Sequence, residues 1–244
     1  MTDTSPTPSA VVTQAALLTV TDIHKSYLRG PEEVHALRGA SFELRRGQVV
    51  ALVGPSGSGK TTLLNVLAGW EHPDAGELRW FDGRPSLEEQ PWSELAILPQ
   101  DLGLIEELSV RENIELPLRL GKRLPQDRPA ADALIASLGL ERLADRSPSE
   151  ASLGEQQRAA LARALVVSPE LLLADEPTGH QDEAWAHGVF GALRTAATGG
   201  TTCLVATHNQ EASKYVDAVL TIRDGLVHTS DAAEGLSPSP RALS

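Results

Sequence analysis

The feature that most constrains this chain is a glycine-rich loop between an apolar run and a helical pattern. The loop reads Gly54-Pro55-Ser56-Gly57-Ser58-Gly59-Lys60-Thr61-Thr62. Its glycines allow backbone N–H groups to curl around phosphate groups at the positive end of the helix that follows. Lys60 then reaches the outer phosphates, and Thr61 offers a hydroxyl to Mg²⁺. The spacing therefore predicts a nucleoside triphosphate site, because chance produces this pattern in only about one per cent of chains of this length.

The composition fits one compact α/β unit. With 244 residues, of which 41% are hydrophobic, the chain is large enough to bury a core. Its 21 Lys and Arg against 33 Asp and Glu give a net charge of −12. This acidic balance argues against non-specific binding to nucleic acid, so we expect no nucleic-acid partner. The single cysteine, Cys203, lies in an apolar run and is expected to be a small core residue.

Both ends of the chain have the composition of flexible tails. Residues 1–16 hold Ser and Pro but neither a basic segment nor a long apolar one, so we expect a disordered tail and not a signal peptide. Residues 229–244 are expected to form a second flexible tail. No run approaches the ~20 apolar residues that a membrane-spanning helix needs. The sequence predicts a folded domain over residues 17–228, and any membrane role would pass through a partner.

Between the tails, the pattern changes from strand to helix and back. Residues 17–82 are strand-rich, whereas residues of about 101–160 are helical, with a capping box at Ser109 and Glu112. We expect Pro117 to end or bend that helix. Strands are then expected at 171–174, 203–206 and 218–222, and helices at 155–167 and 184–196. This alternation predicts a parallel sheet covered on both faces, with the helical segment as an insertion.

Two adjacent carboxylates, Asp175 and Glu176, follow the buried run 171–174. Ligands of parallel sheets gather at such strand ends. Neighbouring side chains of a strand point in opposite directions, so we expect the two carboxylates to have different roles. Asp175 is the natural partner of Mg²⁺, and Glu176 is the candidate to polarise the attacking water. A surface Asp-Glu turn is the alternative, which the phosphate-binding loop upstream disfavours.

A third motif begins the helix that follows Ala151. Ser152 and Glu155 have the spacing of a capping box. A helix start of this kind is also an anion site, because a hydroxyl and free N–H groups point to one place. The local pattern does not choose between the two interpretations.

Taken together, the motifs resemble the ATP-binding subunit of ABC transporters over roughly residues 17–228. The resemblance rests on the loop at 54–62, Gln100, residues 152–158, residues 175–179, Asp182 and Thr207-His208. It implies a RecA-like P-loop core with a mainly parallel sheet, a small N-terminal antiparallel β subdomain and an inserted helical subdomain. It also implies that the chain binds ATP and Mg²⁺ and hydrolyses ATP.

The resemblance assigns roles to residues that would be ordinary in isolation. Tyr27 resembles the aromatic residue that stacks on adenine, although an isolated Tyr near a turn is usually a packing residue. Gln100 resembles the residue that links Mg²⁺ and the lytic water to the helical subdomain. His208 resembles the histidine that holds the γ-phosphate, although alone it would be a surface histidine at a strand end.

The resemblance also implies a head-to-tail dimer of two ATP-binding subunits. The γ-phosphate held by the loop of one subunit would be bound by Ser152, Gly154 and Glu155 of the other subunit. Asp182 would belong to the same nucleotide site. The sequence of residues 102–118 and of residues 173–179 resembles that of the group that includes lipoprotein-release, macrolide-export and cell-division ATPases. Members of that group work with an integral membrane permease, so the subunit is expected on the cytoplasmic side of the cell membrane.

The sequence departs from the family pattern at the motifs of the opposing face. The family prefers two glycines after the motif serine, whereas this chain has Leu153-Gly154, preceded by Ala151. His180-Gln181 precedes Asp182 where Asn-Leu is usual, and Asn209 replaces the usual Asp. These changes keep open a nucleotide-dependent switch that hydrolyses ATP weakly.

Two other classes fit the sequence less well. A soluble relative that acts on DNA or ribosomes typically has two such domains or a long coiled coil, and this chain has room for one domain and no extended heptads. A GTPase is disfavoured because the chain has no Asn-Lys-x-Asp motif.

Overall fold

The chain is built around a six-stranded sheet whose strands are mostly parallel. The structure, a computed structural model, describes residues 15–80, 94–121, 127–177 and 183–231. The strand order is β5 (Leu95–Leu98), β6 (Leu171–Asp175), β7 (Thr202–Thr207), β3 (Val49–Val53), β8 (Ala218–Arg223) and β9 (Leu226–Asp231). Neighbouring strands are parallel except β8 and β9, which pair antiparallel. The expected parallel sheet is confirmed, with one antiparallel edge strand added.

Both faces of the central strands are covered. Every residue of β3, β6 and β7 is buried, which explains their uninterrupted apolar sequences. Alternate residues of these strands belong to two different hydrophobic clusters. One cluster contains the inner faces of α1 (Lys60–Leu67) and of the antiparallel sheet, and the other contains α4 (Leu153–Leu165) and α5 (Glu183–Thr198). Cys203 is fully buried in β7, and this burial raises the pKa of its thiol to about 12.

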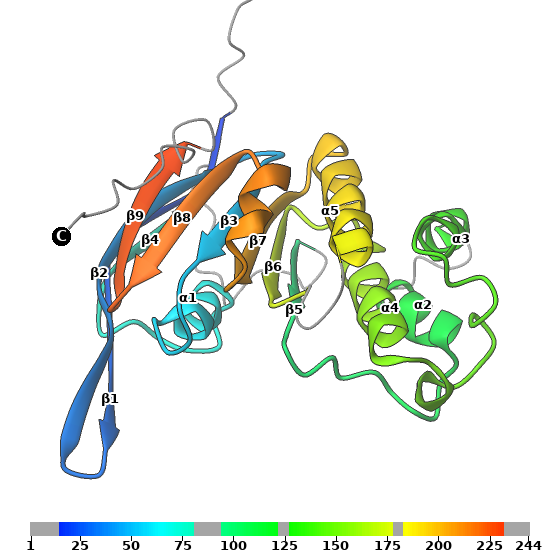
Figure 1. Ribbon diagram of the computed structural model, residues 1–244, viewed down its shortest axis with the longest axis horizontal. Helices are drawn as coiled ribbons and strands as arrows, with labels where there is room; N and C mark the ends of the chain where they lie inside the picture. Colours follow the sequence, from blue (N-terminus) through cyan, green and yellow to red (C-terminus); the bar gives the residue numbers. More distant parts are fainter. Residues whose placement is uncertain (1–14, 81–93, 122–126, 178–182, 232–244) are drawn as a thin grey trace, which may run out of the picture.

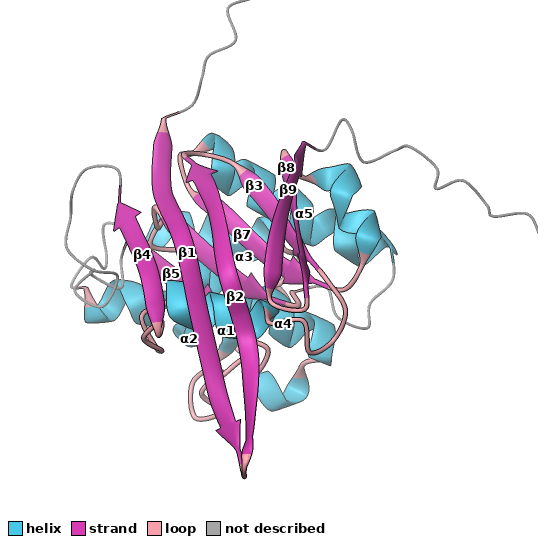
Figure 2. Cartoon of the chain, turned by 90° about the vertical axis from the view of Figure 1, so that its left-hand side faces the viewer, coloured by secondary structure: helices cyan, strands magenta, loops and turns pink. Residues whose placement is uncertain are grey.

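A second sheet of three antiparallel strands packs over the α1 side. Its order is β2 (Glu32–Arg45), β1 (Ala16–Arg29) and β4 (Ala75–Trp80). Figure 2 shows β1 and β2 as the two longest strands, and Figure 1 shows their hairpin projecting from the body of the molecule. Trp80, Leu18 and Leu37 are fully buried beneath this sheet. The small N-terminal antiparallel sheet expected from the resemblance is therefore present.

Strands lie at both ends of the described part of the chain. The first strand already begins at Ala16, and β9 continues to Asp231, three residues beyond the expected boundary at 228. The physical reason is pairing, because β9 lies antiparallel to β8 along its whole length, with Asp231 opposite Ala218. Residues 1–14 and 232–244, which hold most of the two expected tails, lie outside the described residues.

The helical segment gathers at the end of the molecule opposite the antiparallel sheet (Figure 1). It contains α2 (Val110–Leu120), α3 (Arg128–Ser137), the short 3₁₀ helix η2 (Pro148–Glu150) and the start of α4. Another 3₁₀ helix, η3 (Gln210–Tyr215), follows β7. Ser109 and Glu112 form the expected capping box. Pro117, however, does not end α2, because Ile114 and Leu118 on either side of it are fully buried in the core and hold the helix there.

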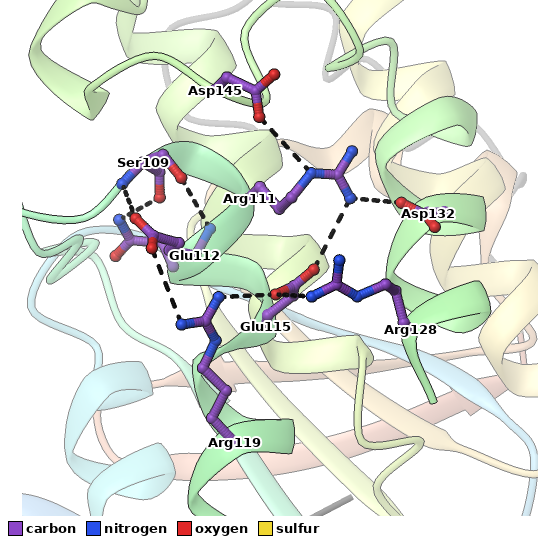
Figure 3. Close-up of polar contacts among 9 residues, drawn as sticks. Ser109, Arg111, Glu112, Glu115, Arg119, Arg128, Asp132 and Asp145 are labelled. Carbon is purple, nitrogen blue, oxygen red and sulfur yellow. Dashed lines mark hydrogen bonds and ion pairs between the residues drawn. The ribbon is translucent and has the colours of Figure 1, made fainter. Parts of the chain in front are cut away.

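A buried carboxylate joins α2 to α3. Glu115 has no exposed surface, and its carboxylate oxygens lie 3.0 Å from Arg119, 3.6 Å from Arg128 and 3.8 Å from Arg111. Arg111 also hydrogen-bonds to Asp132 of α3 (Figure 3). A carboxylate buried in this way is tolerated only when it is paired. The network therefore fixes how the two helices meet.

Within the described part of the chain, no helix has the length and apolar character needed to cross a membrane.

Candidate nucleotide-binding site

A cleft of about 890 Å³ lies near the carboxyl ends of β3, β5, β6 and β7. Eleven of the predicted site residues line it: Tyr27, Ser56, Gly57, Gly59, Lys60, Thr61, Thr62, Gln100, Asp175, Glu176 and His208. Ser152, Gly154 and Glu155 are not part of its wall, but their neighbours Leu153 and Gln157 are. Asp182 lies outside the described residues. The cleft thus assembles predicted site residues that are up to 181 positions apart in the sequence, from Tyr27 to His208.

The phosphate-binding loop runs from the end of β3 to the start of α1. Gly59 precedes the helix with φ of 105°, a conformation that favours glycine. Gly54 leaves room for a close approach, because a Cβ atom there would lie 2.3 Å from the backbone oxygen of Ile222. Lys60 is 8% exposed, and its Nζ donates hydrogen bonds to the oxygens of Gly54 at 2.8 Å and Pro55 at 3.1 Å. The ammonium group is therefore held at the loop itself.

Thr61 and Asp175 form the candidate cation site. The Thr61 hydroxyl donates to the Asp175 carboxylate at 2.8 Å, although 114 residues separate them. Burial raises the pKa of Asp175, and the nearby Glu176 raises it further, while the Thr61 hydrogen bond and Lys60 lower it. A hydroxyl beside a carboxylate is an oxygen donor set that suits Mg²⁺, which keeps several waters and phosphate oxygens as its other ligands. Among the described residues, no group of three or more His, Cys, Asp or Glu side chains converges as a metal site.

Glu176 and His208 form a second pair in the same cleft. Nδ1 of His208 lies 3.0 Å from Oε2 of Glu176, and the glutamate side chain is 17% exposed. The sequence predicts that Asp175 and Glu176 are neighbours within one strand, but they are not, and both line the cleft. The reason is local, because β6 ends at Asp175 and Glu176 has φ of 52°, outside strand geometry. The carboxylates differ instead in their partners, which are Thr61 for one and His208 for the other.

Tyr27 lies at the rim of the cleft, near the projecting hairpin, and is 37% exposed. Its hydroxyl donates a hydrogen bond to Glu71, and Lys25 Nζ lies over its ring, 5.6 Å from the centroid. Burial raises the pKa of Tyr27, and the hydrogen bond to Glu71 acts in the same direction. Glu71 also accepts a hydrogen bond at 3.1 Å from Asn65 of α1. The sequence does not reveal the role of Glu71, because an acidic residue in a loop shows no pattern that predicts hydrogen bonds to Tyr27 and Asn65.

Gln100 is exposed where the chain leaves β5. The loop that follows it is anchored by Arg163 of α4, whose guanidinium donates to the oxygens of Leu102 at 2.5 Å and Gly103 at 2.6 Å. Asn113, fully buried in α2, holds the next part of the loop through hydrogen bonds to Ile105 in both directions. The segment after Gln100 is thus tied to two helices of the helical segment.

The helix start at Ser152 forms the capping box within this protomer. Ser152 Oγ accepts from the Glu155 N–H at 3.4 Å, and the Glu155 carboxylate accepts from Ser152 N at 2.8 Å and Oγ at 2.7 Å. These hydrogen bonds lower the pKa of Glu155. Leu153 is the first helical residue and is 58% exposed. Ser152 and Glu155 therefore cap the start of α4, as the first interpretation predicts. An anion-binding role for the same residues is a separate proposal.

The loop at 54–62, the Thr61–Asp175 contact and the largely parallel sheet define an α/β protein of the P-loop nucleotide-binding class. The signature of the ABC transporter family matches residues 37–179, more than half of the chain, and the chain belongs to this family.

Two curated relatives illustrate the match. The lipoprotein-releasing system ATP-binding protein LolD of Maricaulis maris (strain MCS10) is 42% identical over 212 residues, which are 83% of this chain and 92% of the relative. The macrolide export ATP-binding/permease protein MacB of Chlorobium luteolum (strain DSM 273 / BCRC 81028 / 2530) is 37% identical over 220 residues. That alignment covers 86% of this chain but only 33% of the longer MacB.

The fold matches solved ATP-binding cassettes. A dimeric structure of the post-hydrolysis state of the cassette MJ0796, bound to ADP and Pi, superposes with a TM-score of 0.78 at 28% identity. The match covers 88% of this chain and 99% of that one. The α/β P-loop fold and the family expected from the sequence are confirmed, and the chain's relatives are ATP-hydrolysing, dimerising cassettes of ABC transporters.

Proposed function

We propose that this chain hydrolyses ATP with Mg²⁺ as one half of a head-to-tail dimer and drives a separate integral membrane permease from the cytoplasmic side. The observation that carries the proposal is the placement of Glu176–His208 beside Thr61–Asp175 in one cleft. A general base and a cation site must lie side by side for phosphoryl transfer to water.

Each side chain has a task that follows from its contacts. Thr61 and Asp175 would hold Mg²⁺, which neutralises charge on the phosphate oxygens when bound. Lys60 would bind the same phosphates as a point charge. An ionised Glu176 can only accept hydrogen bonds, so His208 donates from Nδ1 and orients the carboxylate. Glu176 then accepts a proton from the attacking water.

The adenine end of the nucleotide would rest against Tyr27. Its ring is fixed on the rim of the cleft by Glu71 and Lys25, so stacking on a base costs little side-chain ordering. Tyr27 lines the same cleft as the phosphate-binding loop, so one ATP molecule could contact both.

The dimer and the permease are inferred from surfaces and relatives. The exposed Ser152 lies outside the wall of the cleft that contains Lys60, so a second subunit would be needed to bring Ser152, Gly154, Glu155 and Asp182 to each nucleotide site. The cassette MJ0796 is dimeric in a structure with ADP and Pi, and the names LolD and MacB describe systems for lipoprotein release and macrolide export. We therefore place the chain in that group of transporters.

The test of the proposed chemistry is Glu176→Gln. This change keeps the shape of the side chain but removes the base, so ATP binding should persist while turnover falls at least ~100-fold. Steady-state hydrolysis and equilibrium ATP binding would both be measured on the permease-bound complex. Glu77→Gln, an exposed change on β4 outside the cleft, is the matched control and should leave turnover unchanged. Near-normal turnover in Glu176→Gln would rule out the assigned base.

A further inference from the structure

The turn between β8 and β9 lies beside the phosphate-binding loop, and its residues Asp224 and Gly225 line the same cleft. The backbone N–H of Gly225 in this turn donates to the Ser58 oxygen at 3.2 Å. The Gly225 oxygen in turn accepts from the N–H of Arg38 at 2.9 Å. Gly225 therefore links the phosphate-binding loop to β2 through main-chain hydrogen bonds alone, and these bonds join residues 167 positions apart along the chain, from Ser58 to Gly225.

Three stretches of backbone approach one another closely here. A Cβ atom on Gly225 would lie 2.8 Å from the Ala36 oxygen and 3.1 Å from the Leu37 Cα atom. A Cβ atom on Gly59 of the loop would come within 2.5 Å of the same Ala36 oxygen. Gly225 also has φ of +77°, which side chains rarely adopt. Both space and conformation thus require glycine at this position.

The hydrogen bond to Ser58 has a consequence for the neighbouring amide. The peptide between Ser58 and Gly59 is planar and trans, so its C=O and N–H groups point in opposite directions. The oxygen is held on the side of the β8–β9 turn, and Gly59 itself lines the cleft. We propose that Gly225 is a positioning residue for phosphate binding, which orients the Gly59 N–H toward the nucleotide by holding the Ser58 oxygen with its own N–H.

This role is carried by the main chain alone. Gly225 lines the cleft but supplies no side chain, and its N–H is engaged by Ser58. The hydrogen bond affects phosphate binding through the loop. A loop that is already held in its binding conformation loses less conformational entropy when the phosphate binds. Loss of the contact should therefore weaken ATP binding more than it slows hydrolysis at saturating ATP.

The chain offers a matched control for the substitution. Gly139 has φ of +64°, but a Cβ atom there meets nothing within 4 Å. Gly225→Ala and Gly139→Ala both introduce backbone strain, and only the first disturbs the contact with Ala36 and Ser58. We expect Gly225→Ala to raise the Kd for Mg-ATP at least about tenfold and to raise KM more than it lowers kcat. Gly139→Ala should change the Kd less than about twofold, although its melting temperature also falls.

A measurement on the unaltered protein covers the case in which Gly225→Ala does not fold. Coupling between two sites is reciprocal, so ATP must strengthen the Gly225–Ser58 hydrogen bond if that bond favours ATP binding. Hydrogen exchange of the Gly225 amide should slow on adding Mg-ATP. The Gly139 amide, which donates to Ala136 at 3.1 Å, serves as the internal reference for general stabilisation.

The outcomes separate this inference from the proposed function on which it rests. An unchanged Kd in folded Gly225→Ala would overturn the positioning role while leaving ATP binding intact. The same conclusion follows if the Gly225 amide slows no more than the Gly139 amide. Failure of the unaltered chain to bind Mg-ATP would instead overturn the proposed function itself.

Discussion

Leu153 is the residue at which this chain departs most visibly from the family pattern. It is the first residue of α4, where ordinary helical dihedrals need no glycine. Its side chain is 58% exposed and lines the nucleotide cleft. Gly154 is the next residue and lies inside the helix, so it offers the bare backbone that a phosphate can approach. We therefore expect Leu153 to be compatible with an active site.

The two positions can be compared directly. Leu153→Gly should change ATP hydrolysis by only a few-fold, because the helix start and its Ser152 cap remain. Gly154→Asp should nearly abolish hydrolysis, since a carboxylate facing the γ-phosphate adds like-charge repulsion to a steric clash. Both variants are assayed for ATPase activity in the permease-bound complex.

A different result would favour the switch interpretation. If Leu153 holds the unaltered protein in a slow state, restoring glycine should accelerate hydrolysis tenfold or more. That gain would contradict the active-motor account and identify the chain as a nucleotide-dependent switch.

At the residue scale, the sequence reveals those site residues that belong to linear motifs. Lys60 and Thr61 follow the glycines within the loop, and Asp175 stands at the end of a buried run, so their chemistry can be recognised locally. Glu71 and Gly225 could not be found in this way. Each acts through a contact with a distant segment, Tyr27 in one case and Ser58 in the other, and only the fold brings these pairs together.

At the scale of elements, the long buried strands and amphipathic helices were predictable, whereas the edge strands were not. Residues 95–98 form a strand of only four residues, too short for a periodic signal. Residues 226–231 contain His, Thr and Ser and become a strand through pairing with β8. Pro117 shows the same principle in a helix, because the burial of Ile114 and Leu118 outweighs the lost backbone hydrogen bond.

The network around Glu115 gives an element-scale prediction (Figure 3). Glu115→Ala leaves Arg111, Arg119 and Arg128 without their shared buried partner, so the free energy of unfolding should fall by about 3 kcal/mol. Denaturant titration of the isolated chain measures the change.

Glu150→Ala is the matched control for this prediction. Glu150 is half exposed and pairs with Arg146 at 3.9 Å, so its removal should cost less than about 1 kcal/mol. Equal losses in the two variants would mean that the Glu115 network adds no more stability than a surface ion pair.

At the scale of the whole molecule, the cleft is lined by different parts of the chain. The phosphate-binding loop and the carboxylates lie at the ends of strands of the central sheet, and Leu153 and Gln157 come from the helical segment. The antiparallel sheet and the helical segment lie at opposite ends of the central sheet (Figure 1). In a head-to-tail dimer, the start of α4 in one subunit would lie at the phosphate-binding loop of the other. ATP bound between the two subunits would then stabilise the dimer.

The molecular mass of the Glu176→Gln variant tests this account most directly. With hydrolysis blocked, bound Mg-ATP should hold two subunits together, and light scattering should report twice the 26.0 kDa of a single chain. With Mg-ADP the same protein should remain a monomer. A monomer at saturating Mg-ATP, or an equal dimer with no nucleotide, would contradict the claim that ATP joins two copies of this chain.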